Sequence, residues 1–237
     1  MGWGIVSGFE SGVRAGQGIG AASIGNWRRG YGAEERSTWQ RLGGSILAVL
    51  RLVIPVTLLM ALGATSVAYA DQSANVLGQN WLTLGLASLP LTFLAIHLTN
   101  RRYGAGYAFW QVVLAWALSY AAIVYAPGLG FRPSSLVLTR EVAGYALALF
   151  LAQLFAILVF DRMRGPRWWQ APLLASLLGG AVLCLVAFPA AYAGTGIDWP
   201  SRMLDYFTLT SVAALLMIVP YWMMRGLVQP KPGFGGY

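Results

Sequence analysis

A few polar side chains interrupt the long apolar stretches of this chain, and their chemistry could act on another molecule. His97 could relay a proton or contact a substrate, or it could simply hydrogen-bond a neighbouring helix. Gln153 places an amide donor beside an amide acceptor, which suits the edge of a heterocycle and equally suits a bond between helices. Arg140 could be a fixed hydrogen-bond donor facing a central cavity, or a residue of a helix's first turn.

Two adjacent glycines, Gly179 and Gly180, fall in the middle of another apolar stretch. They permit either the close packing of two helices or a break in a helix at a binding site near the membrane midplane. Asp205 stands at the expected start of the last apolar stretch, where a carboxylate caps a helix.

Several kinds of site are excluded by composition. The chain has one cysteine, Cys184, and one histidine, so no disulfide and no zinc site are expected within it. Cys184 lies in an apolar stretch and is expected to be a small buried side chain. No nucleophile is accompanied by a base, so we expect no catalytic residue, no cofactor and no resident metal. The tryptophans, Trp116 among them, fit the aromatic belts of a membrane protein.

The elements that must position these residues are membrane-spanning helices. Of the 237 residues 57% are hydrophobic and only 10% are charged, whereas soluble domains carry roughly 25% charged residues. Apolar stretches of about 19–25 residues are long enough to cross about 30 Å of hydrocarbon as helices. We therefore predict an all-α, polytopic membrane protein with six spans. Their approximate ranges are 46–70, 81–99, 104–126, 139–160, 168–192 and 206–228.

Basic residues alternate between the predicted loops as six spans require. Twelve arginine and lysine residues fall on one side of the membrane and two on the other, which predicts that both termini are cytoplasmic. The net charge of +8 is then explained by orientation and by contact with anionic lipid headgroups, without a nucleic-acid partner. The twelve are Arg14, Arg28, Arg29, Arg36, Arg41, Arg101, Arg102, Arg162, Arg164, Arg167, Arg225 and Lys231, and the two are Arg132 and Arg202.

Three regions follow from this pattern: a glycine-rich cytoplasmic segment (1–44), the bundle of spans (45–228) and a short cytoplasmic tail (229–237). In the first region, apolar residues recur at steps of three and four, which would place them on one face of a short helix. Such a helix could lie on the membrane surface or in a groove of another membrane subunit, while the alternative is a flexible tail. These residues are Trp3, Val6, Phe9 and Val13.

Four stretches resemble the queuosine precursor transporter family, also called the vitamin uptake transporter family. Pro90–Gly104 is similar to the second-span signature of that family, and Arg140–Arg164 is similar to the fourth span. Arg167-Trp168-Trp169-Gln170-Ala171-Pro172 and Leu204-Asp205-Tyr206 continue the likeness, which covers roughly residues 80–228. The resemblance implies six helices and uptake of a small deazaguanine-type base through the bacterial cytoplasmic (inner) membrane.

The chain also departs from the family pattern where polar groups lie at membrane depth. His97, Ala156 and Leu209 stand where the family carries an aspartate, an aspartate and a lysine. Gly179-Gly180 and Leu183-Cys184 stand where it carries Gly-Asn and Asp-Thr. The family residues that remain are Arg140, Gln153 and Asp205.

Two functions therefore compete. A carrier would move a small neutral, purine-like molecule inward past Arg140, Gln153 and His97, with Gly179 and Gly180 letting the backbone approach it. A non-transporting homologue would instead serve as a structural subunit of a larger membrane complex. Each unmatched polar group in a dry site costs about 1–3 kcal/mol, and a micromolar affinity is only about 8 kcal/mol, so the missing groups favour the second function. The family likeness favours the first, and the sequence leaves both open.

Overall fold

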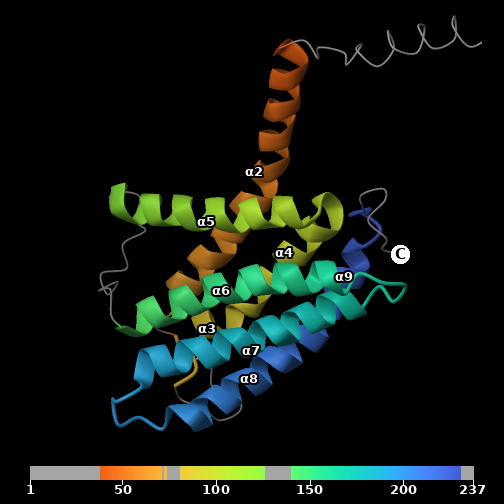
Figure 1. The fold of residues 1–237 in the computed structure, drawn as a ribbon. Helices are drawn as coiled ribbons and strands as arrows, with labels where there is room; N and C mark the ends of the chain where they lie inside the picture. The colour runs from red at the N-terminus through yellow and green to blue at the C-terminus, as the bar shows by residue number, and fades with distance from the viewer. Residues whose placement is uncertain (1–37, 71, 74–80, 126–139, 231–237) are drawn as a thin grey trace, which may run out of the picture. The chain divides into compact units, whose positions relative to one another are not determined.

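The computed structural model describes residues 38–70, 72–73, 81–125 and 140–230, and within them the regular elements are helices (Figure 1). The predicted all-α class is confirmed. The chain divides into two units, Met1–Ala48 and Val49–Tyr237, and the helix bundle is the second unit. The helices are α2 (Thr38–Ala68), α3 (Leu84–Ser88), α4 (Pro90–Tyr103), α5 (Ala105–Tyr125), α6 (Arg140–Arg162), α7 (Gln170–Tyr192), α8 (Trp199–Leu216) and α9 (Ile218–Met224).

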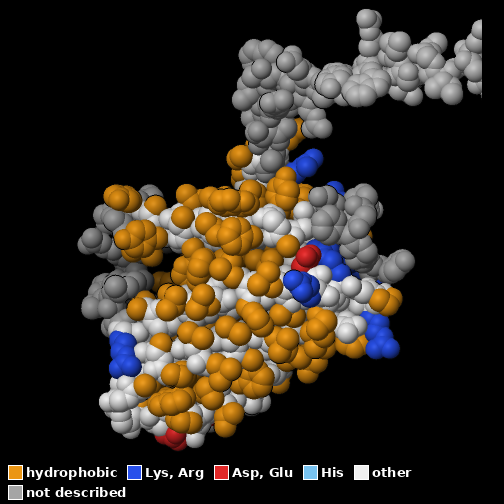
Figure 2. Space-filling view, in the orientation of Figure 1, with side chains coloured by type: hydrophobic (Ala, Val, Ile, Leu, Met, Phe, Trp, Pro, Cys, Tyr) orange, Lys and Arg blue, Asp and Glu red, His pale blue; other side chains and the backbone are white. Residues whose placement is uncertain are grey.

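Five stretches of these helices are long and apolar enough to cross a membrane. They correspond to the first, third, fourth, fifth and sixth predicted spans, and the chain is therefore a multi-pass membrane protein. Figure 2 shows hydrophobic side chains spread over the face formed by α5 to α8, as expected for helices that meet lipid. The five are Val49–Ala68, Ala105–Ile123, Arg140–Arg162, Gln170–Tyr192 and Trp199–Met224.

The second predicted span is a broken helix. α3 ends at Ser88, and α4 begins at Pro90, whose ring cannot continue a helix but fits its first turn. The linking residue, Leu89, keeps right-handed helical angles, so α3 and α4 together extend roughly 30 Å. α4 runs on to Tyr103, beyond the predicted end at about residue 99, because Asn100, Arg101 and Arg102 are held by protein groups rather than lipid.

The sixth span begins earlier than predicted. α8 starts at Trp199, seven residues before the predicted start at 206, because Pro200 in its first turn suits the start of a helix. Asp205 therefore lies within α8 and does not cap it, so that expectation was wrong; the residue at the cap position is Asp198.

Small residues repeated every four positions hold α6 and α7 together, and these two helices form the most extensive helix pair of the bundle. A Cβ atom added at Gly144 would lie 3.2 Å from the backbone nitrogen of Ala191, and one added at Gly179 would lie 3.1 Å from Cβ of Ala156. The two contacts have the same register in an antiparallel pair. The intervening steps then bring Ala148 opposite Ala187.

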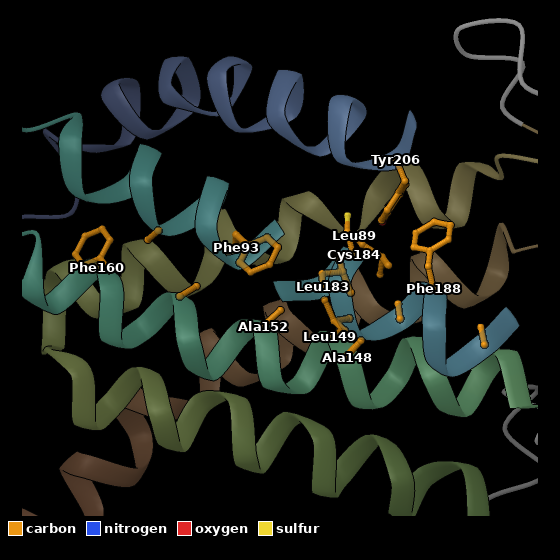
Figure 3. Close-up of a cluster of buried hydrophobic side chains, with 14 of the residues drawn as sticks. Leu89, Phe93, Ala148, Leu149, Ala152, Phe160, Leu183, Cys184, Phe188 and Tyr206 are labelled. Carbon is orange, nitrogen blue, oxygen red and sulfur yellow. The ribbon is translucent and has the colours of Figure 1, made fainter. Parts of the chain in front are cut away.

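This small-residue stripe is almost completely buried, and it continues into the main hydrophobic cluster. Figure 3 shows Ala148 and Ala152 of α6 in that cluster near Leu183 of α7, with Phe93 of α4 beside them. On α6 the stripe comprises Gly144, Ala148, Ala152 and Ala156, and on α7 it comprises Ala175, Gly179, Ala187 and Ala191, with the larger Leu183 between Gly179 and Ala187.

The arginine-bearing ends of α4, α6 and α9 meet at one end of the bundle. Arg101 donates from Nε to the carbonyl of Val228 at 2.9 Å, and Arg164 donates from Nη2 to the carbonyl of Asn100 at 2.7 Å. These three chain segments thus share a side, as the predicted alternation of spans requires. That this side faces the cytoplasm stays a prediction from the distribution of charge.

The close approach at Gly179 leads to a stability prediction. Gly179→Ala should destabilise the bundle by about 1–3 kcal/mol, because the new Cβ would lie 2.9 Å from Cε1 of the buried Phe93 ring. Gly63→Ala in α2 should be neutral or stabilising by up to about 1 kcal/mol, because nothing lies within 4 Å of its Cβ position. Thermal unfolding of both variants in one detergent measures the difference, and equal shifts would contradict the packing described for α6 and α7.

Candidate functional site

Gln153 lies at the centre of a chain of hydrogen bonds that joins three helices. Trp116 of α5 donates from Nε1 to Oε1 of Gln153 at 2.8 Å. The amide nitrogen of Gln153 donates to Oγ1 of Thr92 in α4 at 3.2 Å, and Thr92 donates to the carbonyl of Leu89 at 2.7 Å. Because an indole N–H can only donate, the direction of every bond in this chain is determined. Gln153 therefore joins α4, α5 and α6 in the way the interhelical alternative predicted.

His97 lies within a column of rings. Its side chain is 1% exposed and stacks against Phe160, with ring centroids 5.1 Å apart, and against Phe93, with centroids 6.4 Å apart. Its Nε2 atom lies 2.9 Å from Oγ of Ser176 in α7, and the hydrogen bond between these two atoms joins α4 to α7. The Nδ1 atom is buried without a hydrogen-bond partner among the described residues.

The two glycines make close contacts between helices. Gly179 faces Phe93 and Ala156, while a Cβ atom at Gly180 would lie 3.1 Å from Oγ1 of Thr210 in α8. α7 is a continuous helix through both positions, so the glycines do not mark a break in it. Of the two alternatives that the sequence left open, close packing of helices describes the glycines, and a break of the fifth span does not.

Arg140 lies apart from the other candidates. It is exposed at the first residue of α6, and its Nε donates to the carbonyl of Ala190 at 2.7 Å. Thirteen residues of helix separate it from Gln153, which is about 20 Å. The structure thus brings His97 and Gly179 against Phe93 and bonds Gln153 to the adjacent Thr92. It places Arg140 at the end of the bundle opposite Arg101.

The central polar groups bond mainly to groups on neighbouring helices. Gln153 uses one donor and one acceptor in hydrogen bonds to neighbouring helices. Asn100, which is fully buried, donates to the carbonyl of Ile157 in α6 at 3.2 Å. Among the described residues no group of histidine, cysteine and acidic side chains could hold a metal ion. Cys184 is buried, as expected of a small apolar side chain. The arrangement can fix helices against one another, and it leaves few polar atoms for a ligand.

Sequence reasoning missed the partners of Gln153 and His97. Trp116 was expected in an aromatic belt at the membrane surface, but it lies halfway along α5 and bonds to Gln153, so that expectation was wrong. A tryptophan at the midpoint of a span was the available signal. Ser176 carried no comparable signal, because a serine in a span commonly bonds its own backbone. Trp3, Val6, Phe9 and Val13 lie outside the described residues.

Comparison of the chain with models of known protein families, with characterised proteins and with solved structures finds no match.

The bond between Trp116 and Gln153 can be tested by a double-mutant cycle. Gln153→Met should cost about 1–2 kcal/mol, because it leaves the indole N–H of Trp116 buried without an acceptor. In a Trp116→Phe background the same change should lose most of that cost, since no donor remains unpaired.

Trp110→Phe is the matched control, because the Trp110 ring is 54% exposed and lies on the same helix. Gln153→Met should retain its full cost in that background. The free energy of unfolding in detergent is the measurement, and equal costs in the Trp116→Phe and wild-type backgrounds would exclude an energetic coupling between Gln153 and Trp116.

Proposed function

We propose that this chain is a non-transporting subunit of a larger complex in the bacterial inner membrane, built on a helix bundle like that of queuosine precursor transporters. The sequence motifs quoted above support the family likeness. The observation that supports the absence of transport is the hydrogen-bond chain through Gln153, whose donor and acceptor both bond to neighbouring helices. A heterocycle recognised in a dry site needs such groups unoccupied, because its own polar atoms must be matched there.

The packing around that chain supports the same proposal. Ala152 and Ala156, one on each side of Gln153 along α6, are fully buried, and Phe93 fills the space against Gly179. Opening a site at this depth would separate α4 from α7, which the His97–Ser176 bond holds together. A bundle that is closed by its own contacts is suited to a structural role.

The outer face of α2 is the surface that we assign to the partner. Only 11% of the most apolar part of its membrane span is buried in the protein, against 50% for α7. Val56 and Leu59 pack inward, whereas Ile54 is 76% exposed and Val49 is 63% exposed. The occupant we propose is a membrane-spanning helix of another protein, since a helix attached by so narrow a face gains van der Waals contacts from a second neighbour.

Photocrosslinking in native membranes tests this assignment. Ile54→p-benzoylphenylalanine should give one crosslinked product with a defined added mass, because that side chain points away from the bundle. The matched control is the same change at Leu215, an exposed residue of α8 (59%), which should give only lipid adducts. Similar products from both positions, or a product of twice the mass of this chain, would contradict a distinct partner on α2.

Transport remains the second candidate because of one observation. The Nδ1 atom of His97 is buried without a partner in the described part of the chain, and this polar atom of the central group could meet a small neutral molecule. Such a carrier would bind its substrate between α4, α6 and α7, beside Phe160 and Ser176.

Uptake measurements separate the two functions. In cells that lack their own queuosine precursor carrier, expression of this chain should give no accumulation of labelled deazaguanine above that of empty vector. Accumulation that His97→Ala abolishes and Arg140→Ala preserves would instead establish the carrier, because only His97 lies in the central group. Surface expression of each variant is compared in parallel.

A further inference from the structure

One end of the bundle gathers positive charge far in excess of negative charge. The ends of α4, α6 and α9 and the start of the connection to α7 meet there, and Figure 2 shows basic side chains where α6 leads into α7. Six arginines face one acidic residue, Asp161, among the described residues of this end. We call this group the arginine end; its arginines are Arg101, Arg102, Arg162, Arg164, Arg167 and Arg225.

Three of these arginines hold the chain segments together. Arg164 donates from Nε to Asp161 at 2.9 Å and from Nη2 to both oxygens of Asn100 at 2.7 Å. Arg101 and Arg102 donate to the carbonyls of Val228 and Gln229, which follow α9. Carbonyl groups satisfy hydrogen-bond donors without neutralising their charge, so Asp161 remains the only carboxylate that balances this group among the described residues.

The other three arginines are available to an external anion. Arg162 and Arg167 are exposed and make no hydrogen bond or ion pair within the described part of the chain. The guanidinium group of Arg225 lies over the ring of Trp168, 5.3 Å from its centroid, which orients it beside the α6–α7 connection without using its charge on an acid.

The position of these groups indicates what the anion is. Arg162 ends the span of α6, and Trp168 lies two residues before the span of α7, so this end lies at the level of the lipid headgroups. Tryptophan favours that level, and a phosphate diester is the anion that lipids present there.

The two terminal segments outside the described residues carry more basic than acidic side chains. Residues 1–37 contain four arginines and three glutamates, and residues 231–237 contain Lys231 and no acidic side chain. The side chains of each segment therefore sum to one positive charge.

We infer that the arginine end binds the phosphate group of an anionic phospholipid, with Arg162, Arg167 and Arg225 as its donors. Guanidinium groups pair with phosphate through two parallel hydrogen bonds, which lysine cannot form. The inner arginines, Arg101 and Arg164, raise the local positive potential while remaining bound to the protein. The inference is independent of whether the bundle is a subunit or a carrier.

Native mass spectrometry of the full chain from mild detergent tests this inference, using added phosphatidylglycerol and phosphatidylcholine as probes. Wild-type protein should retain phosphatidylglycerol at least fivefold more than phosphatidylcholine. Replacing both outer residues, in Arg162→Gln/Arg167→Gln, should lower the retention of phosphatidylglycerol about 25-fold, since each arginine near a charged surface contributes about fivefold. The fold should persist, because neither side chain forms a hydrogen bond or ion pair with the residues that the structure describes.

The matched control is Arg140→Gln/Arg202→Gln, which removes the same charge at the opposite end and should leave retention unchanged. Arg162→Lys/Arg167→Lys keeps the charge and should lose only a few-fold. Equal retention of the two lipids, or an unchanged Arg162→Gln/Arg167→Gln variant, would overturn the inference. If millimolar inorganic phosphate displaced both lipids and neither lipid was preferred, the site would bind a free anion, and the inference of a lipid ligand would be overturned.

Discussion

The bundle depends on the close approach of α6 and α7. Lipid tails are as apolar as the side chains they would replace, so burying hydrophobic surface does not by itself drive two helices together in a membrane. Van der Waals contact between backbones does, and it requires small residues at the interface. Gly144 and Gly179 provide it at two points in register along the pair, and the alanines between them maintain the four-residue step. Once α6 and α7 are joined, α4 has a surface on which Phe93 can pack.

α4 can be polar because the other helices surround it. It is too short and too polar to cross a membrane alone, yet Thr92, His97 and Asn100 each have a partner on α6 or α7. Each bond closes a contact between two particular helices, and together they select one arrangement of α4 among those that apolar packing would allow. A polar residue at membrane depth commonly indicates a transport path. The donor and the acceptor of Gln153 instead bond to neighbouring helices, which supports the proposed structural role.

Length, hydropathy and charge were enough to predict the class of fold and five of the spans, because each of those helices has its own continuous apolar stretch. The second span was predicted from the same rule. Its break falls at Pro90, which was visible in the sequence, whereas the enclosure of α4 by other helices was not. The start of α8 was misplaced since hydropathy begins to rise only after Pro200, whereas the helix begins with it. For the candidate site, residue types identified Gln153 and His97 as buried polar groups. Their partners could not be identified, because Trp116 and Ser176 lie 37 and 79 residues away in sequence.

The arginines show how one residue type can serve both topology and structure. A positive-inside bias needs only charge, and lysine would provide it equally well. Bonding of Arg164 to Asp161 and to both oxygens of Asn100 needs a planar group with several donors at fixed angles, which lysine lacks. The sequence contains 16 basic residues of which only Lys231 is a lysine, so this preference extends over the whole chain. Arg101 explains why the preference matters in the bundle. It is 5% exposed and donates from Nε to the carbonyl of Val228, a bond for which the guanidinium group offers a donor at a fixed angle on a planar group and the flexible ammonium group of lysine does not.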